Sequence, residues 1–105
     1  MAKMLNDRLA LHELLCEKLG SRNVYFQPPE SVKMKYPAIV YSRDRIENVS
    51  ADNITYKQSV SYSITVIDRD PDSEIVERVS DIPHIMYERS YVADNLNHDV
   101  FTLFV

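Results

Sequence analysis

The sequence predicts an α+β fold of two layers, in which a mainly antiparallel sheet of four to five strands is packed by an N-terminal helix and a second short helix. Three patterns predict it: a helical apolar stripe at the N-terminus, alternation of apolar and polar residues over 55–67, and two strand-like runs that close the chain. Strands joined by short connections are most simply antiparallel, and two amphipathic helices then cover one face of their sheet.

The first helix is predicted over residues 2–19. Leu5, Leu9 and Leu15 belong to an apolar stripe that recurs every three or four positions, which is the period of an amphipathic helix. Gly20, the only glycine in the chain, follows directly. It suits the position past a helix end, because a left-handed backbone costs glycine least.

A short edge strand, a longer strand and a loop are predicted next. Residues 23–27 include an apolar run, but Pro28 and Pro29 follow and neither can donate a hydrogen bond to a sheet ladder, so this strand lies at an edge. Residues 38–43 form the next strand. Residues 43–53 are mostly polar and are predicted to form a long loop.

Residues 55–67 give the clearest strand pattern. Val60, Tyr62, Ile64 and Val66 alternate with serine and threonine side chains. A period of two means one buried face and one polar face, and an antiparallel sheet can leave one face in water. The polar face consists almost entirely of hydroxyl side chains, so it is either solvated or covered by a neighbouring molecule.

A second helix and a terminal hairpin complete the fold. Asp70 suits the cap of the helix, Pro71 suits its first position, and Pro83 ends it. Residues 85–91 and 98–105 form the two strands of the hairpin, joined by turn-forming residues. The last strand is strongly apolar and is therefore predicted to lie inside the sheet.

Length and composition predict one soluble globular domain over residues 1–105. The chain has 45% apolar and 27% charged residues, which suffices for one hydrophobic core. Its net charge is −4 and its basic residues are scattered, so direct, specific nucleic-acid binding is not expected. No apolar run approaches the ~20 residues that span a bilayer, so no membrane segment is expected. A single cysteine and the lack of a secretory pattern predict assembly in a cytoplasm.

The sequence offers little for catalysis. One glycine is too few for a phosphate-binding loop. His12 lies four residues before Cys16 on the predicted helix, where a base and a nucleophile would meet. Both residues fall on the apolar stripe, however, and a buried cysteine behaves as a small hydrophobic side chain. We therefore predict that this pair packs in the core.

Metal binding is weighed against ordinary structural roles. His84 and His98 flank the predicted hairpin and, with Asp94 or Asp99, would make a three-ligand site, although no spacing motif supports it. The acidic run 68–74 lacks the glycine and the later glutamate of a calcium-binding loop. Helix capping accounts for its carboxylates at least as well as calcium binding does. We predict no catalytic residue, no cofactor, no metal and no enzyme activity. A small metal- or cysteine-dependent enzyme is the alternative from another class.

Two segments resemble the tail terminator family of long-tailed bacteriophages. Tyr62 to Ile75 reads Tyr-Ser-Ile-Thr-Val-Ile-Asp-Arg-Asp-Pro-Asp-Ser-Glu-Ile, and Tyr91 to Phe104 reads Tyr-Val-Ala-Asp-Asn-Leu-Asn-His-Asp-Val-Phe-Thr-Leu-Phe. The strand opening Tyr-Pro-Ala-Ile-Val-Tyr of residues 36–41 also fits the family. Its members are also called tail-completion or head-tail joining proteins and are labelled minor capsid proteins in phage genomes. The resemblance covers roughly residues 5–105.

The resemblance implies a structural virion protein without enzyme activity. Members of the family assemble as a ring, usually with six subunits, on the last ring of the tail tube, where they stop tail growth. The implied partners are further copies of the chain, the tail tube protein and the head-connector or stopper protein. The implied location is the head–tail junction of the virion, after assembly in the cytoplasm of the bacterial host. A head-closure, or stopper, protein of the neck is the nearest alternative.

Two polar segments are the predicted contact surfaces, because loops held on a rigid sheet are the usual place for binding. They are residues 43–53 and 68–73. We add Arg89 and Tyr91 of the final hairpin, because arginine and tyrosine are enriched in protein interfaces. The predicted interface residues are Arg43, Arg45, Glu47, Asn48, Asp52, Asn53, Asp68, Arg69, Asp70, Asp72, Arg89 and Tyr91.

Overall fold

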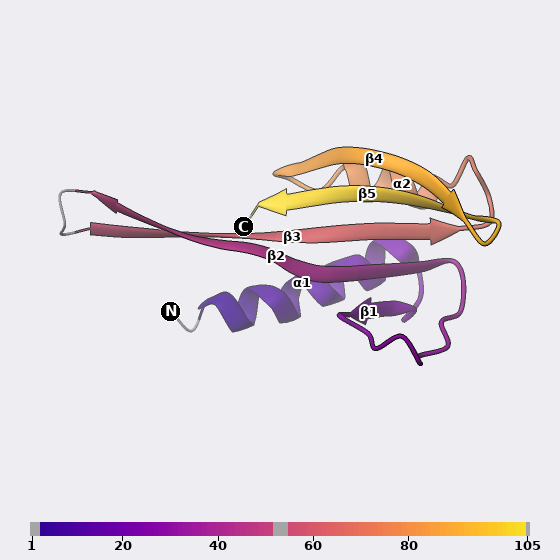
Figure 1. The fold of residues 1–105 in the computed structure, drawn as a ribbon, viewed down its shortest axis with the longest axis horizontal. Helices are drawn as coiled ribbons and strands as arrows, with labels where there is room; N and C mark the ends of the chain where they lie inside the picture. Colours follow the sequence, from indigo (N-terminus) through magenta and orange to yellow (C-terminus); the bar gives the residue numbers. More distant parts are fainter. Residues whose placement is uncertain (1–2, 52–54, 105) are drawn as a thin grey trace.

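The computed structural model describes the backbone of residues 3–51 and 55–104, and the side chains of residues 8–45 and 60–104. It confirms an α+β domain with two helices and a mostly antiparallel five-stranded sheet (Figure 1). The elements in chain order are α1 (Lys3–Leu19), β1 (Val24–Phe26), β2 (Ala38–Ala51), β3 (Thr55–Asp68), α2 (Glu74–Ser80), β4 (Ile85–Ala93) and β5 (Leu96–Phe104).

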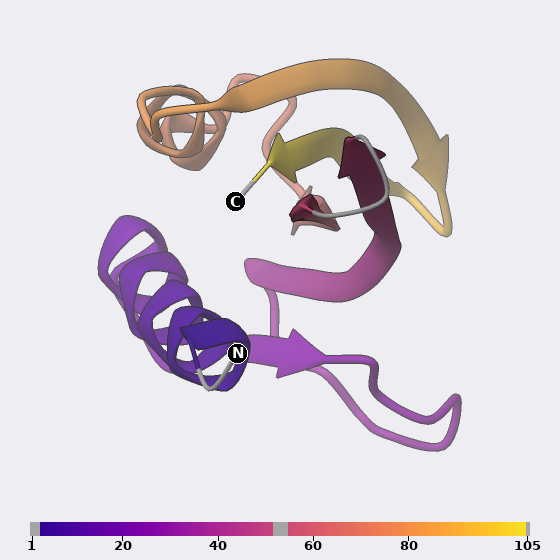
Figure 2. The ribbon, with the colours of Figure 1, turned by 90° about the vertical axis from the view of Figure 1, so that its left-hand side faces the viewer.

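The strands are arranged in the order β1-β2-β3-β5-β4. β1 runs parallel to β2, whereas the other neighbouring strands are antiparallel. The short first strand lies at an edge and the last strand lies inside the sheet, as the sequence predicts. Both helices lie on the same side of the curved sheet (Figure 2), which confirms the predicted two layers.

Helix α1 ends where the sequence predicts. Its apolar side buries Leu11, Leu15 and Leu19 against the sheet, whereas Leu9, which the sequence places in the same stripe, is 57% exposed. Gly20 adopts a φ of 85°, and its N–H donates to the Cys16 carbonyl oxygen at 2.9 Å. The left-handed glycine therefore closes the last turn of the helix.

The alternation of β3 separates the core from the uncovered face of the sheet. Val60, Tyr62, Ile64 and Val66 are buried in the core beneath the helices. On the other face the hydroxyl side chains are only partly accessible, and Ser61 is 6% exposed. The hydroxyl face therefore belongs to the sheet surface that the helices leave open.

The predicted loop over 43–53 is wrong, because β2 continues as a strand to Ala51 and pairs with β3 as far as Thr55. Most residues of this stretch are polar and do not alternate regularly with apolar ones, so its sequence reads as a connection. The register shifts once, between Arg43 and Arg45, which marks a β-bulge at the base of the extension.

The predicted start of α2 is also wrong. Ser73, and not Asp70, caps the helix, since its Oγ accepts from the Ile75 N–H at 3.2 Å. Asp70 instead accepts from the Asp72 N–H at 2.9 Å, which places Pro71 in a turn before the helix. Asp-Pro-Asp favours such side-chain-bonded turns, and the serine that follows takes over the capping role.

The terminal hairpin is confirmed and is longer than predicted. β4 extends to Ala93 and β5 begins at Leu96, so only Asp94 and Asn95 connect them. Their φ angles are 53° and 62°. Two positive values are what a two-residue type I′ turn requires, and its twist matches that of the strands.

Candidate interaction surfaces

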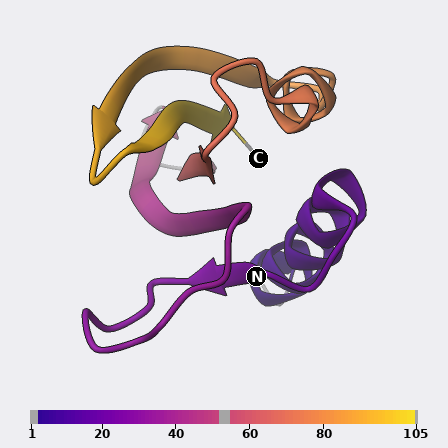
Figure 3. The same cartoon turned by 90° about the vertical axis from the view of Figure 1, so that its right-hand side faces the viewer.

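The predicted interface residues that the structure describes fall into two groups along a molecule that measures 50 × 24 × 23 Å. One group lies on the extended β2–β3 hairpin. The other lies where the β3–α2 connection and the β4–β5 turn meet (Figures 1 and 3). We call the first region the arm and the second the turn end. Asp52 and Asn53 fall outside the residues that the structure describes.

The arm is the part of β2 and β3 that has no third strand beside it. β1 pairs with β2 only as far as Tyr41, and β5 pairs with β3 only as far as Ser61. Beyond these points β2 and β3 pair only with each other, from Arg45 opposite Ser61 to Ala51 opposite Thr55. At about 3.3 Å per residue the seven residues of β2 in the arm extend by roughly 20 Å. Glu47 and Asn48 lie in this strand.

The base of the arm is fastened to the body by local hydrogen bonds. The Arg43 N–H donates to Gln27 Oε1 at 3.2 Å, which caps the end of the β1–β2 pairing. Ser61 Oγ donates to Asp44 Oδ2 at 3.4 Å across the bulge. Arg43 and Arg45 are both exposed beside these contacts. The base therefore presents two guanidinium groups on a fixed backbone.

At the turn end, two connections that are distant in sequence are tied together. Asn97 Nδ2 donates to the carbonyl oxygens of Asp68 and Arg69, both at 3.2 Å. Within the turn, Asp68 Oδ1 accepts from the Asp70 N–H at 3.1 Å. These bonds fix the backbone of the acidic turn, while Asp70 and Asp72 remain exposed to solvent.

Arg89 and Tyr91 form an exposed group on β4 next to this turn. The Tyr91 ring stacks on His98 with 4.6 Å between ring centroids and 12° between planes. The Arg89 guanidinium carbon lies 5.6 Å from the centre of the same ring. Tyr91 is 43% exposed and Val92 is 68% exposed. Exposed tyrosine, arginine and apolar side chains held in one place are the composition of a contact hot spot.

The exposure of Met86 on β4 and an apolar groove on α1 were not predicted. Met86 and Tyr87 are each 49% exposed. A second apolar region lies between α1, the end of α2 and the end of β5, and Leu11, Leu14 and Phe104 are among its lining residues. The strand pattern of β4 was visible in the sequence, but no signal showed that both of its faces remain accessible.

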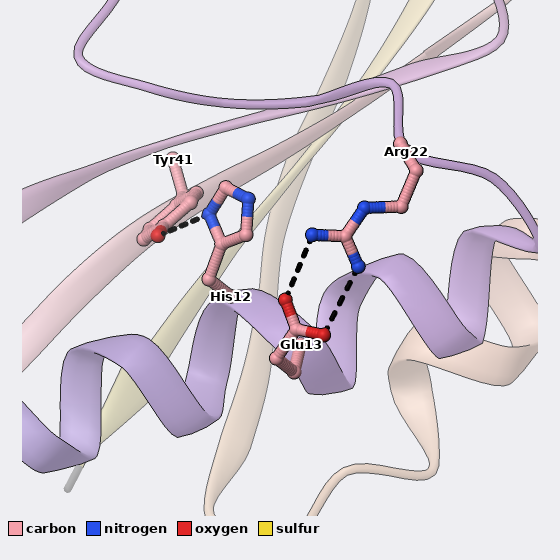
Figure 4. Close-up of polar contacts among 4 residues, drawn as sticks. All are labelled: His12, Glu13, Arg22 and Tyr41. Atoms are coloured by element: carbon pink, nitrogen blue, oxygen red, sulfur yellow. Dashed lines mark hydrogen bonds and ion pairs between the residues drawn. The ribbon is translucent and has the colours of Figure 1, made fainter.

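The structure explains His12 and Cys16 as packing residues. His12 Nδ1 is hydrogen-bonded to the Tyr41 hydroxyl at 2.7 Å (Figure 4), and burial lowers the pKa of the imidazole. Burial also raises the pKa of the Cys16 thiol. A nucleophilic cysteine needs the opposite shift, because the thiolate is the reactive species.

A charged pair lies on the outer side of the same helix. Arg22 donates to both carboxylate oxygens of Glu13, at 2.9 and 3.0 Å (Figure 4). The hydrogen bond from Arg22 lowers the pKa of the Glu13 carboxyl. Both side chains also line an open depression that reaches Cys16. Because the fork of Arg22 is already occupied by Glu13, the pair fastens the turn after α1 to the helix.

The premise of a histidine metal site is wrong. His84 directly precedes β4, whereas His98 lies opposite Tyr91 near the other end of the β4–β5 hairpin. His84 and Tyr91 are seven residue steps apart along the strand, which is roughly 23 Å. Within the described side chains, no group of three or more histidine, cysteine, aspartate or glutamate residues is placed to hold a metal ion.

Two comparisons with known proteins complete the description. No protein-family model matches the chain, and a search of curated proteins also finds no match. Among the described residues, no helix is both long enough and apolar enough to cross a membrane.

Proposed function

We propose that the chain is a tail terminator: a structural virion protein that caps the tail tube of a long-tailed phage as a ring and docks to the head connector. The observation that carries the proposal is the pair of unlike surfaces at the two ends of one elongated domain. A ring subunit contacts each neighbour through two different patches that meet head to tail. The arm and the turn end would serve as such patches, and the resemblance of residues 62–75 and 91–104 supports the choice of this family.

The chemistry of the surfaces agrees with a role in assembly. The exposed groups at both ends are arginine, aspartate and tyrosine side chains on fixed backbone, which suit contacts between proteins. The surplus of four negative charges per subunit would give a ring an acidic character. An acidic channel lets DNA pass without adhering to the wall.

The decisive experiment is electron microscopy of a lysate from the parent phage with this gene silenced. Tails of uncontrolled length beside full, tailless heads are expected, because the tube would no longer be capped. Free tails of normal length beside heads that leak DNA would contradict the proposal and assign the protein to head closure.

The predicted contact residues at the arm base have a test of their own. Replacing Arg43 and Arg45 together by alanine removes two exposed guanidinium groups without removing a core side chain. We expect weaker ring assembly on purified tails by a variant that still folds, as its urea unfolding transition would show. Assembly equal to that of the wild type would remove these residues from the interface.

The competing enzyme hypothesis rests on Cys16 and the depression beside it. Because burial raises the pKa of the thiol, a disulfide reagent should modify the native protein at least about tenfold more slowly than the urea-unfolded chain. A native thiol that reacts as fast as the unfolded one, or faster, would favour a reactive cysteine.

A further inference from the structure

We infer that the arm of one copy adds as an extra strand to the open edge of β4 in a second copy, so that copies associate head to tail. The inference deepens the proposed function by naming the two surfaces that pair. It rests on the homo-oligomer in that proposal, but not on the phage tail as its location.

The arm has two strand edges without partners among the described residues. From Arg45 to Ala51 the outer edge of β2 faces no other strand, since β1 ends its pairing at Tyr41. A two-stranded ribbon is only marginally stable in water, and a third strand stabilises it. Unpaired strand edges are also the usual template for association with another chain.

β4 provides an acceptor edge at the other side of the sheet. It is the last strand of the order, and its outer edge forms the margin of the molecule in Figure 3, with α2 beside its beginning. Edge strands are commonly protected by lysine, proline or a bulge. β4 has neither lysine nor proline, and its single register shift lies between Tyr87 and Arg89. The stretch after the bulge therefore remains open, and Val92 within it is 68% exposed.

Geometry selects a second copy as the occupant. The arm extends away from the body, and the open stretch of β4 leads towards the turn end, at the opposite end of the 50 Å axis (Figure 1). A chain therefore does not reach its own acceptor edge with its own arm. Of the two edge strands in the described sheet, β1 has only three residues and β4 has nine, so β4 is the edge that matches the arm in length. The contact then joins two different surfaces and passes from copy to copy.

Charge and strand direction set the orientation. When two copies point the same way, the arm base of one lies at the turn end of the next. Arg43 and Arg45 at the base then face the exposed carboxylates of Asp70, Asp72 and Asp94, which outnumber the two exposed arginines of that region, Arg69 and Arg89. In this orientation β2 of the arm runs antiparallel to β4, the more stable of the two pairings.

A photo-cross-linker placed on β4 tests the contact directly. With p-benzoylphenylalanine in place of Ser90, we expect irradiation at millimolar protein to join β4 to the arm of another copy. Trypsin cuts after Arg45 and Lys57, so the arm is released as the single peptide 46–57. Mixing ¹⁵N-labelled and unlabelled protein gives heavy–light adducts only for links between copies. The same probe in place of Ser31, an exposed residue before β2, should not yield this peptide.

A pair of charge substitutions provides the matched control. Val92→Lys places a charge on the acceptor edge and should lower the adduct yield by about tenfold. Leu9→Lys places the same charge on an exposed leucine of α1 and should leave the yield unchanged. The inference is overturned by the absence of heavy–light adducts, by adducts that join β4 to β4, or by loss of adducts with the Leu9 variant alone.

The outcomes for the arm and for the phage tail are separable. Adducts between arm and β4, together with tails of normal length after silencing of the gene, would keep the strand addition and remove the tail terminator. Tails of uncontrolled length without any adduct between arm and β4 would keep the tail terminator and remove the strand addition.

Discussion

The body and the arm share two strands, yet they are stabilised in different ways. In the body, β2 and β3 lie beneath both helices, and Tyr41, Tyr62 and Ile64 are fully buried. In the arm the same strands continue with only each other as partners. Burial of apolar surface therefore stabilises the body, and Val60 at the base of the arm still belongs to this core; beyond it, the described contacts between β2 and β3 are those of the strand ladder. The difference places the folding core in the body and agrees with the association that we propose for the arm.

The largest predicted effect lies in the body. Phe101 is fully buried, and Phe101→Ala should lower the free energy of unfolding by about 3–5 kcal/mol, measured by urea denaturation. Phe104, three residues later on the same strand, is 47% exposed. Phe104→Ala should cost less than about 1 kcal/mol. Equal losses in the two variants would show that the core does not end where the structure places its boundary.

Two buried tyrosines of the body differ in whether their hydroxyl groups have a hydrogen-bond partner. The Tyr41 hydroxyl is hydrogen-bonded to His12 at 2.7 Å, whereas the Tyr62 hydroxyl is buried with no hydrogen-bond partner in the described part of the chain. Tyr41→Phe should therefore lower the free energy of unfolding by about 1–2 kcal/mol, because His12 loses its partner. Tyr62→Phe should leave it unchanged or raise it slightly.

Both tyrosine variants retain a buried aromatic ring, so they form a matched pair for chemical denaturation. A loss at position 62 as large as that at position 41 would mean that the Tyr62 hydroxyl is satisfied in solution.

The sequence predicted the body well because its patterns report burial. The alternation of Val60, Tyr62, Ile64 and Val66 identified the core face of β3, and Gly20 identified the end of α1. The four β3 residues all face the helical layer, so they recur at every second position, which is the period of a strand.

The arm and the surfaces could not be predicted in this way. The run 43–53 is mostly polar and has no regular alternation, so nothing in its spacing distinguishes a strand from a loop. Asp70 and Ser73 are both good capping residues, and only the turn geometry selects the serine. The stacking of Tyr91 on His98 depends on the register of the hairpin, which the turn residues Asp94 and Asn95 determine.

A variant with a shortened arm tests whether the body folds without the arm. Replacing residues 48–58 by Asn-Gly joins β2 to β3 through a two-residue turn just beyond the body. We expect a change in the free energy of unfolding of less than about 1 kcal/mol, because an isolated hairpin adds little stability. Sedimentation analysis should show the loss of self-association. A loss of several kcal/mol would show that the arm packs on the body.

The smallest predicted effect is a pH dependence within the body. Burial lowers the pKa of His12 below its ordinary value of 6.5, so the unfolded chain binds a proton more readily than the native one. The free energy of unfolding should therefore fall as the pH decreases through 6.5 towards the lower native pKa. His12→Gln should remove this part of the slope in urea unfolding measured between pH 8 and pH 5.

The Glu13 carboxyl provides an internal control for this measurement. The hydrogen bond from Arg22 holds its pKa below the ordinary value of 4.5, so its stabilising contribution is present above that pH and is lost only as the pH falls further. The pH ranges in which His12 and Glu13 titrate do not coincide. His12→Gln should therefore remove the pH dependence of the free energy of unfolding only in the higher range. If the free energy of unfolding of the variant still falls between pH 8 and pH 5, His12 is not the cause of the pH dependence. That result would also contradict the view that the buried contact with Tyr41 keeps the imidazole neutral.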